Sequence, residues 1–153
     1  MSEPPFDIAI AHRWFAVELN NVAWELIELP SRTAEEVQRM ITAAHTSLYH
    51  WQQVGNSVHQ LRAETLVAAA YLAAGWPERA LPHAAAAFAM CEQAGDQPTQ
   101  FDRACVYGGL SIALRRLDKF EGAETYQTLA EAAVANLHDA EEVATFTRLY
   151  PLE

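Results

Sequence analysis

YLAAGWPERALPHAAAA occupies residues 71–87, and LRRLDKFEGAETYQTLA occupies residues 114–130. Each stretch reads as the end of one helix, a tight turn and most of a second helix, and the second follows the first at a distance of about 43 residues. One such unit cannot bury its apolar face by itself, so its repetition implies that neighbouring units stack on each other. The repeat therefore predicts an all-α fold of antiparallel helix pairs.

On both sides of this repeat, apolar residues recur at steps of three and four along the rest of the 153-residue chain. Proline and glycine separate these periodic stretches and give about seven helices in one domain, 1–153. The predicted pairs are 7–54, 57–94 and 99–137, followed by a C-terminal capping helix at 139–150. Polar residues mark the helix starts. The expected pairings are Thr33 with Glu36, Ser57 with Gln60, Thr99 with Asp102, Asp118 with Glu121, and Asp139 with Glu142.

The charge of the chain restricts its partners. The formal net charge is −10, and Lys119 is the only lysine, so no basic patch exists to neutralise phosphates. We therefore expect no nucleic-acid partner. More than half of the net negative charge lies after Leu117, which makes the C-terminal end an acidic surface. The N-terminus lacks a signal-peptide pattern and no apolar run is long enough to span a bilayer, so we expect a cytoplasmic protein without a membrane partner.

The spacing of small residues in the repeat resembles that of tetratricopeptide (TPR) proteins. In the first unit the matching positions are an aromatic residue, a turn glycine and three small residues. They are Tyr71, Gly75, Ala68, Ala80 and Ala87. In the second unit the same offsets hold Leu114, Asp118, Ser111, Ala123 and Ala130, with Leu110 preceding them. Glu64, Glu92 and Ala135 depart from the motif.

The resemblance implies a short, TPR-like right-handed solenoid that binds a protein or a peptide and performs no catalysis. In such a stack the first helix of each pair lines the concave side, which here means helices one, three and five. The segments RTAEEVQRM and AAHTSLYHWQQVG are also similar to uncharacterised small bacterial proteins of about this length. That similarity implies no activity.

Side chains that could bind a ligand or take part in catalysis are most concentrated on the first two helices. His45 and Tyr49 share a helical face, but His50 lies about 140° away from His45, so the two histidines do not face one narrow site. HEXXH is absent, and we expect no metal. Cys91 and Cys105 lie in apolar helical faces without CxxC spacing, which is typical of buried thiols. Gly108 and Gly109 lack the residues of a phosphate loop and favour close helix packing or a local bend instead.

Three hypotheses follow for the function. The first is a non-catalytic scaffold or adaptor with no cofactor, able to form a homodimer through aromatic anchors. These anchors are Trp14, Phe15 and Trp24 on helix one, or Trp76 at a turn. The second is a small-molecule or metal-binding sensor or enzyme that uses His12, Trp24, His45 and Tyr49. The third is a regulatory protein whose acidic end meets a basic partner.

The first hypothesis is the one we adopt, and it predicts a set of binding residues. Polar and aromatic side chains of helices one, three and five are expected to line the groove, together with the polar pair of helix two. The predicted binding residues are Asn20, Asn21, Trp24, His45, Tyr49, Arg62, Arg103 and Tyr107.

Overall fold

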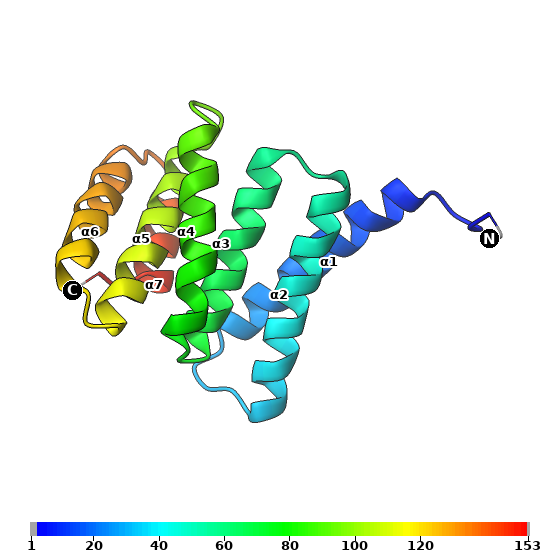
Figure 1. Cartoon of the computed structure of the whole chain (residues 1–153), viewed down its shortest axis with the longest axis horizontal. Coiled ribbons are helices and arrows are strands. Elements are labelled where there is room, and N and C mark those ends of the chain that lie inside the picture. The colour runs from blue at the N-terminus through cyan, green and yellow to red at the C-terminus, as the bar shows by residue number, and fades with distance from the viewer. Residues whose placement is uncertain (1–2, 153) are drawn as a thin grey trace.

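A computed structural model describes residues 3–152, and every regular element in that range is a helix. The seven helices of that range confirm the prediction of an all-α fold. The helices are α1 (Ile8–Ile27), α2 (Ala34–Val54), α3 (Ser57–Ala73), α4 (Pro77–Gln93), α5 (Gln100–Arg116), α6 (Phe120–Ala135) and α7 (Ala140–Leu149). Figure 1 shows that the helices from the N-terminus to α6 follow one another as antiparallel hairpins.

The helices form two layers. Each consecutive pair packs along its length: α1 on α2, α3 on α4, and α5 on α6. Within the odd-numbered layer α1 also packs on α3, and α3 packs on α5, whereas α2, α4 and α6 pack chiefly on their odd-numbered neighbours. This packing of consecutive pairs is consistent with a helical repeat. Within the described range, no helix is both long and apolar enough to cross a membrane.

The backbone repeats at the turns in the same way as the sequence does. At the α3–α4 turn the N–H of Trp76 donates to the carbonyl of Tyr71, and 43 residues later the N–H of Lys119 donates to the carbonyl of Leu114. The residue before each donor has a left-handed backbone, with φ of 79° at Gly75 and 58° at Asp118. The two units therefore share one turn geometry although only one of them has glycine.

The small residues of the repeat lie where the paired helices meet. They are fully or almost fully buried, and their size lets the helix backbones approach closely. These residues are Ala68, Ala80, Ala87, Ser111, Ala123 and Ala130. The hydroxyl of Ser111 donates to the carbonyl of Ala123 across the α5–α6 contact. Residue size at these positions thus determines how the pairs pack.

Helix starts follow the predicted pairings at two sites and differ at three. Thr33 with Glu36 and Thr99 with Asp102 form complete capping boxes. Asp139 caps α7 as predicted, but its side chain accepts from the N–H of Glu141 and not from Glu142. For α3 the prediction was wrong by one residue, because Asn56 is the N-cap and His59 is its partner. For α6 it was wrong in kind. Lys119 occupies the N-cap without a side-chain bond, since Asp118 provides the left-handed turn.

The C-terminal helix α7 lies against α5 and does not extend the stack of hairpins. Phe146 and Tyr150 pack on α5 beside Gly108, where an added Cβ would lie 3.0 Å from the Phe146 ring. Across the odd-numbered layer, Arg148 pairs with Glu28 near the end of α1 at 3.2 Å. Helix α7 therefore covers part of the face that α1, α3 and α5 expose on the side away from α2 and α4.

Candidate binding groove

A cavity of about 510 Å³ lies on the face of the odd-numbered layer, and we call it the inner groove. Four helices contribute to it: α1, α3, α5 and α7. Its lining residues are Asn20, Trp24, Glu28, Leu61, Arg62, Thr65, Thr99, Phe101, Asp102, Cys105, Glu142, Thr145 and Leu149. Its apolar walls come from Trp24, Leu61, Phe101, Cys105 and Leu149, and the other eight lining residues have polar side chains.

An ion pair between α3 and α5 forms part of the groove wall. The Arg62 guanidinium donates from Nε and Nη2 to the two Asp102 oxygens, at 2.8 and 2.9 Å. The Asp102 side chain is 7% exposed, and burial by itself would raise its carboxyl pKa. Hydrogen bonds from Arg62 and from the Thr99 backbone outweigh burial and hold the pKa of Asp102 below its ordinary value. The bidentate pair fixes α3 against α5 at the groove.

The α1 side of the groove continues into a second cavity. This neighbouring space has a volume of about 310 Å³ and shares Asn20 and Arg62 with the inner groove. Its other lining residues are Val17, Trp51, His59 and Ala63. Asn20 therefore lies at the junction of the two spaces, whereas its neighbour Asn21 is exposed and lines neither of them.

Of the eight predicted binding residues, three line the inner groove: Asn20, Trp24 and Arg62. Arg103 and Tyr107 lie on the other side of α5. The Arg103 guanidinium donates to the carbonyl of Gly95 at the end of α4, and the Tyr107 hydroxyl lies 3.4 Å from Glu92. The prediction placed the polar residues of helices one, three and five on one concave face. Adjacent residues of an α-helix point in directions about 100° apart, so these side chains do not all share that face.

The two predicted residues of α2 also lie away from the groove. Nε2 of His45 is 2.8 Å from the Tyr71 hydroxyl, and the His45 ring lies 5.3 Å from that of His83, which in turn contacts Glu64. Burial and the neighbouring His83 lower the pKa of His45, so its neutral form is favoured. Tyr49 is 53% exposed. The structure thus separates these side chains from Trp24 and Arg62.

The second hypothesis required His12, Trp24, His45 and Tyr49 to share a cavity. His12 is bonded to His50 through their Nδ1 atoms at 2.7 Å, whereas His45 points to Tyr71. Trp24 alone among the four lines the inner groove. Within residues 3–152, no set of three or more His, Cys, Asp and Glu side chains is placed to hold a metal ion.

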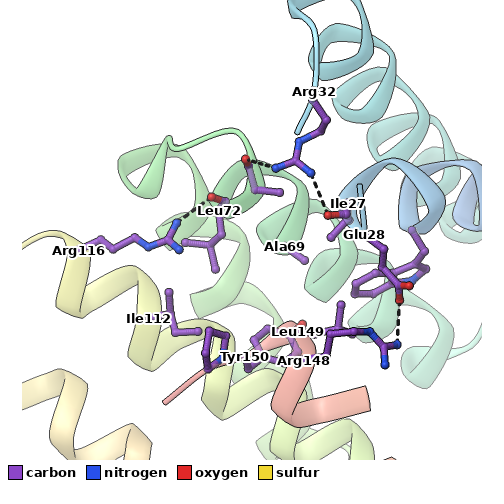
Figure 2. A pocket seen from close by; sticks show the side chains of 13 residues that line it. Ile27, Glu28, Arg32, Ala69, Leu72, Ile112, Arg116, Arg148, Leu149 and Tyr150 are labelled. Carbon is purple, nitrogen blue, oxygen red and sulfur yellow. Dashed lines mark hydrogen bonds and ion pairs between the residues drawn. The ribbon is translucent and has the colours of Figure 1, made fainter. Parts of the chain in front are cut away.

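A third cavity, of about 270 Å³, lies beside α7 at the ends of α1, α3 and α5. Figure 2 shows Arg32, Arg116 and Arg148 around it, each directed to an acceptor. Arg116 donates to the carbonyl of Leu72, and Arg148 pairs with Glu28. Arg32 donates to the carbonyls of Leu26, Ile27, Leu29 and Ala73. Arg32 and Arg116 therefore satisfy backbone groups that α1 and α3 leave free.

The inner groove contains one thiol, and the third cavity borders one buried phenol. Burial raises the pKa of the Cys105 thiol, so it remains protonated and is a poor nucleophile. The Tyr150 side chain is buried beneath the third cavity, and burial raises its pKa as well. Among the residues that the structure describes, its hydroxyl has no hydrogen-bond partner.

Several groove residues were missed by sequence reasoning. Asp102 was expected only as the partner of Thr99 in a capping box, yet it also holds Arg62. Leu149 and the other residues of α7 were assigned to a capping helix, because periodicity does not show which earlier element a C-terminal helix will face. The signal for Phe101 was present: it precedes Asp102 at the start of a helix predicted to line the groove.

No family model, curated protein or solved structure matches the chain. The resemblance to TPR proteins therefore rests on residue spacing alone.

Proposed function

We propose that this chain is a non-catalytic, TPR-like scaffold or adaptor module that binds a protein or peptide segment in its inner groove. One observation carries the proposal. The face of α1, α3 and α5 holds a cavity of about 510 Å³ whose walls combine Trp24, Leu61 and Phe101 with the Arg62–Asp102 pair. This combination supplies apolar contact area and a small number of fixed polar groups.

The charge of the groove indicates which segment it prefers. Arg62 is already paired with Asp102, and Glu28 is paired with Arg148, so Glu142 is the lining carboxylate for which no ion pair is seen in residues 3–152. A segment with apolar side chains and a flanking Lys or Arg therefore complements these walls better than an acidic one. The two free, buried thiols are typical of a cytoplasmic protein.

The test is a peptide selection on the immobilised protein, followed by affinity measurements with two matched variants. Asn20→Arg places a long side chain at the junction of the groove and its neighbouring cavity. Asn21→Arg makes the same change one residue later, at an exposed position outside both spaces. We expect selected peptides to bind Asn20→Arg at least tenfold more weakly than wild type and to bind Asn21→Arg equally well.

Two results would contradict the proposal. One is a selection that yields no peptide binding the wild-type protein. The other is a set of peptides that both variants bind with wild-type affinity, which would place the site elsewhere. Circular dichroism of both variants checks that the added arginine leaves the helices intact.

A further inference from the structure

The most exposed apolar surface of the chain lies at the beginning of α1. We call this surface the α1 tip and define it as Phe6, Ile8, Ile10, Trp14, Phe15 and Val17, all of which are exposed. Ile10 is 69% exposed and Trp14 is 58% exposed. Figure 1 shows that this end of α1 extends past α2 and away from the other helices. The remaining exposed large apolar residues are scattered along the chain.

The tip residues lie on faces of α1 that its own fold leaves largely exposed, although the Phe15 ring stacks on that of His50 at a centroid distance of 5.4 Å. Ile10, Trp14 and Val17 follow steps of four and three, so they form one stripe. Ile8 and Phe15 are seven residues apart and form a second stripe, and the rings of Trp14 and Phe15 lie 5.0 Å apart. Ala16 and Ala23 form the buried face of the same helix. A helix that is apolar on nearly all sides is normally covered on all of them.

The area of the tip lies at the upper end of what a monomer usually exposes. With about 200 Å² as the full surface of a large apolar side chain, the exposed fractions leave roughly 600 Å² uncovered. The largest apolar patch on a typical monomer is about 300–600 Å². A standard interface takes about 800 Å² from each partner. Residues of α1 next to the tip can supply the difference, so the tip has the size of an interface.

The charge of the tip is compatible with a second copy as its partner. The whole chain has a net charge of −10, so two copies repel each other over most of their surface. Residues 6–17 contain one acid, Asp7, and one permanent cation, Arg13, and are therefore neutral. A membrane is a poorer match, because an interfacial helix needs several Lys or Arg on its polar face, and Arg13 already lies 5.8 Å from the Trp51 ring.

We propose that two copies of this chain form a symmetric dimer by packing the α1 tip of one protomer against the α1 tip of its partner. A two-fold axis makes each tip the ligand of the other, so the same residues are covered in both copies. Asn20 and Trp24 lie beyond the tip, so the inner groove of each protomer stays open, although Val17 of the tip lines the neighbouring cavity. This inference concerns a second surface and does not depend on the proposed peptide binding.

Sedimentation velocity of the full chain over a range from low to high micromolar concentration tests the dimer. The tip variant is Ile10→Ser with Trp14→Ser. The matched control, Phe120→Ser with Leu129→Ser, removes two exposed apolar residues of α6. We expect the wild type and the control to be dimeric and the tip variant to dissociate at least tenfold more readily. Helical content from circular dichroism should be equal in all three proteins.

A wild-type monomer at every concentration would overturn the proposal, and so would equal dissociation of the control and tip variants. If Thr145→Arg, on the α7 side of the inner groove, also dissociates the dimer, the tip of one copy enters the groove of the other, and symmetric tip-to-tip pairing is wrong. Flotation with vesicles of phosphatidylcholine and phosphatidylglycerol provides a further check. Vesicle binding by a monomeric wild type, lost in the tip variant, would assign the surface to a lipid partner.

Discussion

Gly75 and Asp118 occupy equivalent turn positions, but the left-handed backbone conformation costs them different amounts of free energy. Both have positive φ, which glycine adopts freely and an L-residue with a Cβ adopts only with strain. No atom lies within 4 Å of a Cβ added at Gly75, so a substitution there tests the backbone alone. The repeat thus contains its own matched pair of positions.

Exchanging the two residue types should move stability in opposite directions. Asp118→Gly should stabilise the fold by about 0.5–1 kcal/mol, because relief of strain exceeds the extra entropy that glycine loses. Gly75→Ala should destabilise it by about 1 kcal/mol. Urea unfolding measures both changes. Wild-type stability in Gly75→Ala, or a loss of stability in Asp118→Gly, would show that these turns are not equivalent.

Histidine protonation should make the fold sensitive to mild acid. Burial lowers the pKa of His45, His50 and His59 from 6.5 in the folded state. As the pH falls through 6.5, the unfolded chain binds protons first, so the free energy of unfolding decreases. The loss should occur between about pH 7 and pH 5.

Unfolding curves at a series of pH values measure how much the free energy of unfolding falls per pH unit. His45→Gln should make this decrease smaller, and the decrease that remains should come from His50 and His59. A free energy of unfolding that stays constant or rises upon acidification across this range would contradict the burial of neutral imidazoles.

Asp102 acts at lower pH, because its depressed pKa gives stability that is lost only as the pH falls below the usual carboxyl range.

At the scale of elements, α7 is held by two adjacent glycines of α5 that have different surroundings. A Cβ on Gly108 would lie 3.0 Å from the Phe146 ring, closer than ordinary contact. A Cβ on Gly109 would lie 3.5 Å from Tyr150, which is a normal distance. The predicted role of this pair in close helix packing is therefore confirmed, and it applies chiefly to Gly108.

Alanine at the two positions separates helix propensity from packing. Both changes stabilise the helical conformation of α5 by about 1 kcal/mol, because alanine has a higher helix propensity than glycine. Gly109→Ala should keep most of that gain, whereas Gly108→Ala should lose it and loosen α7. Hydrogen exchange of the amides of 140–149 reports the second effect. Equal protection of α7 in both variants would mean that Gly108 does not determine how α7 docks.

The helices themselves could be predicted closely from the sequence. Periodicity and caps such as Thr33 with Glu36 depend on neighbours within four residues, so they locate helix ends well. The partner of a helix at long range depends on packing that no local pattern records. The resemblance to TPR proteins predicted a groove on the odd-numbered layer. No sequence pattern predicted that α7 would lie beside Glu28.

At the scale of the whole molecule, the structure presents two separate surfaces. The inner groove combines α1, α3, α5 and α7, and the α1 tip lies at the far end of the same first helix. Asn20 and Trp24 were predicted for the groove because helix one is the first helix of its pair. Arg103 and Tyr107 were misplaced because the direction of a side chain around α5 depends on its exact rotation against α4.

Binding of a partner segment in the inner groove is the central claim, and amide chemical-shift mapping with the tightest selected peptide tests it most directly. We predict that the perturbed amides belong to residues 17–28, 61–65 and 99–105, with further changes in α7. Perturbations confined to α2, α4 and α6 would place binding on the opposite layer and would contradict the claim.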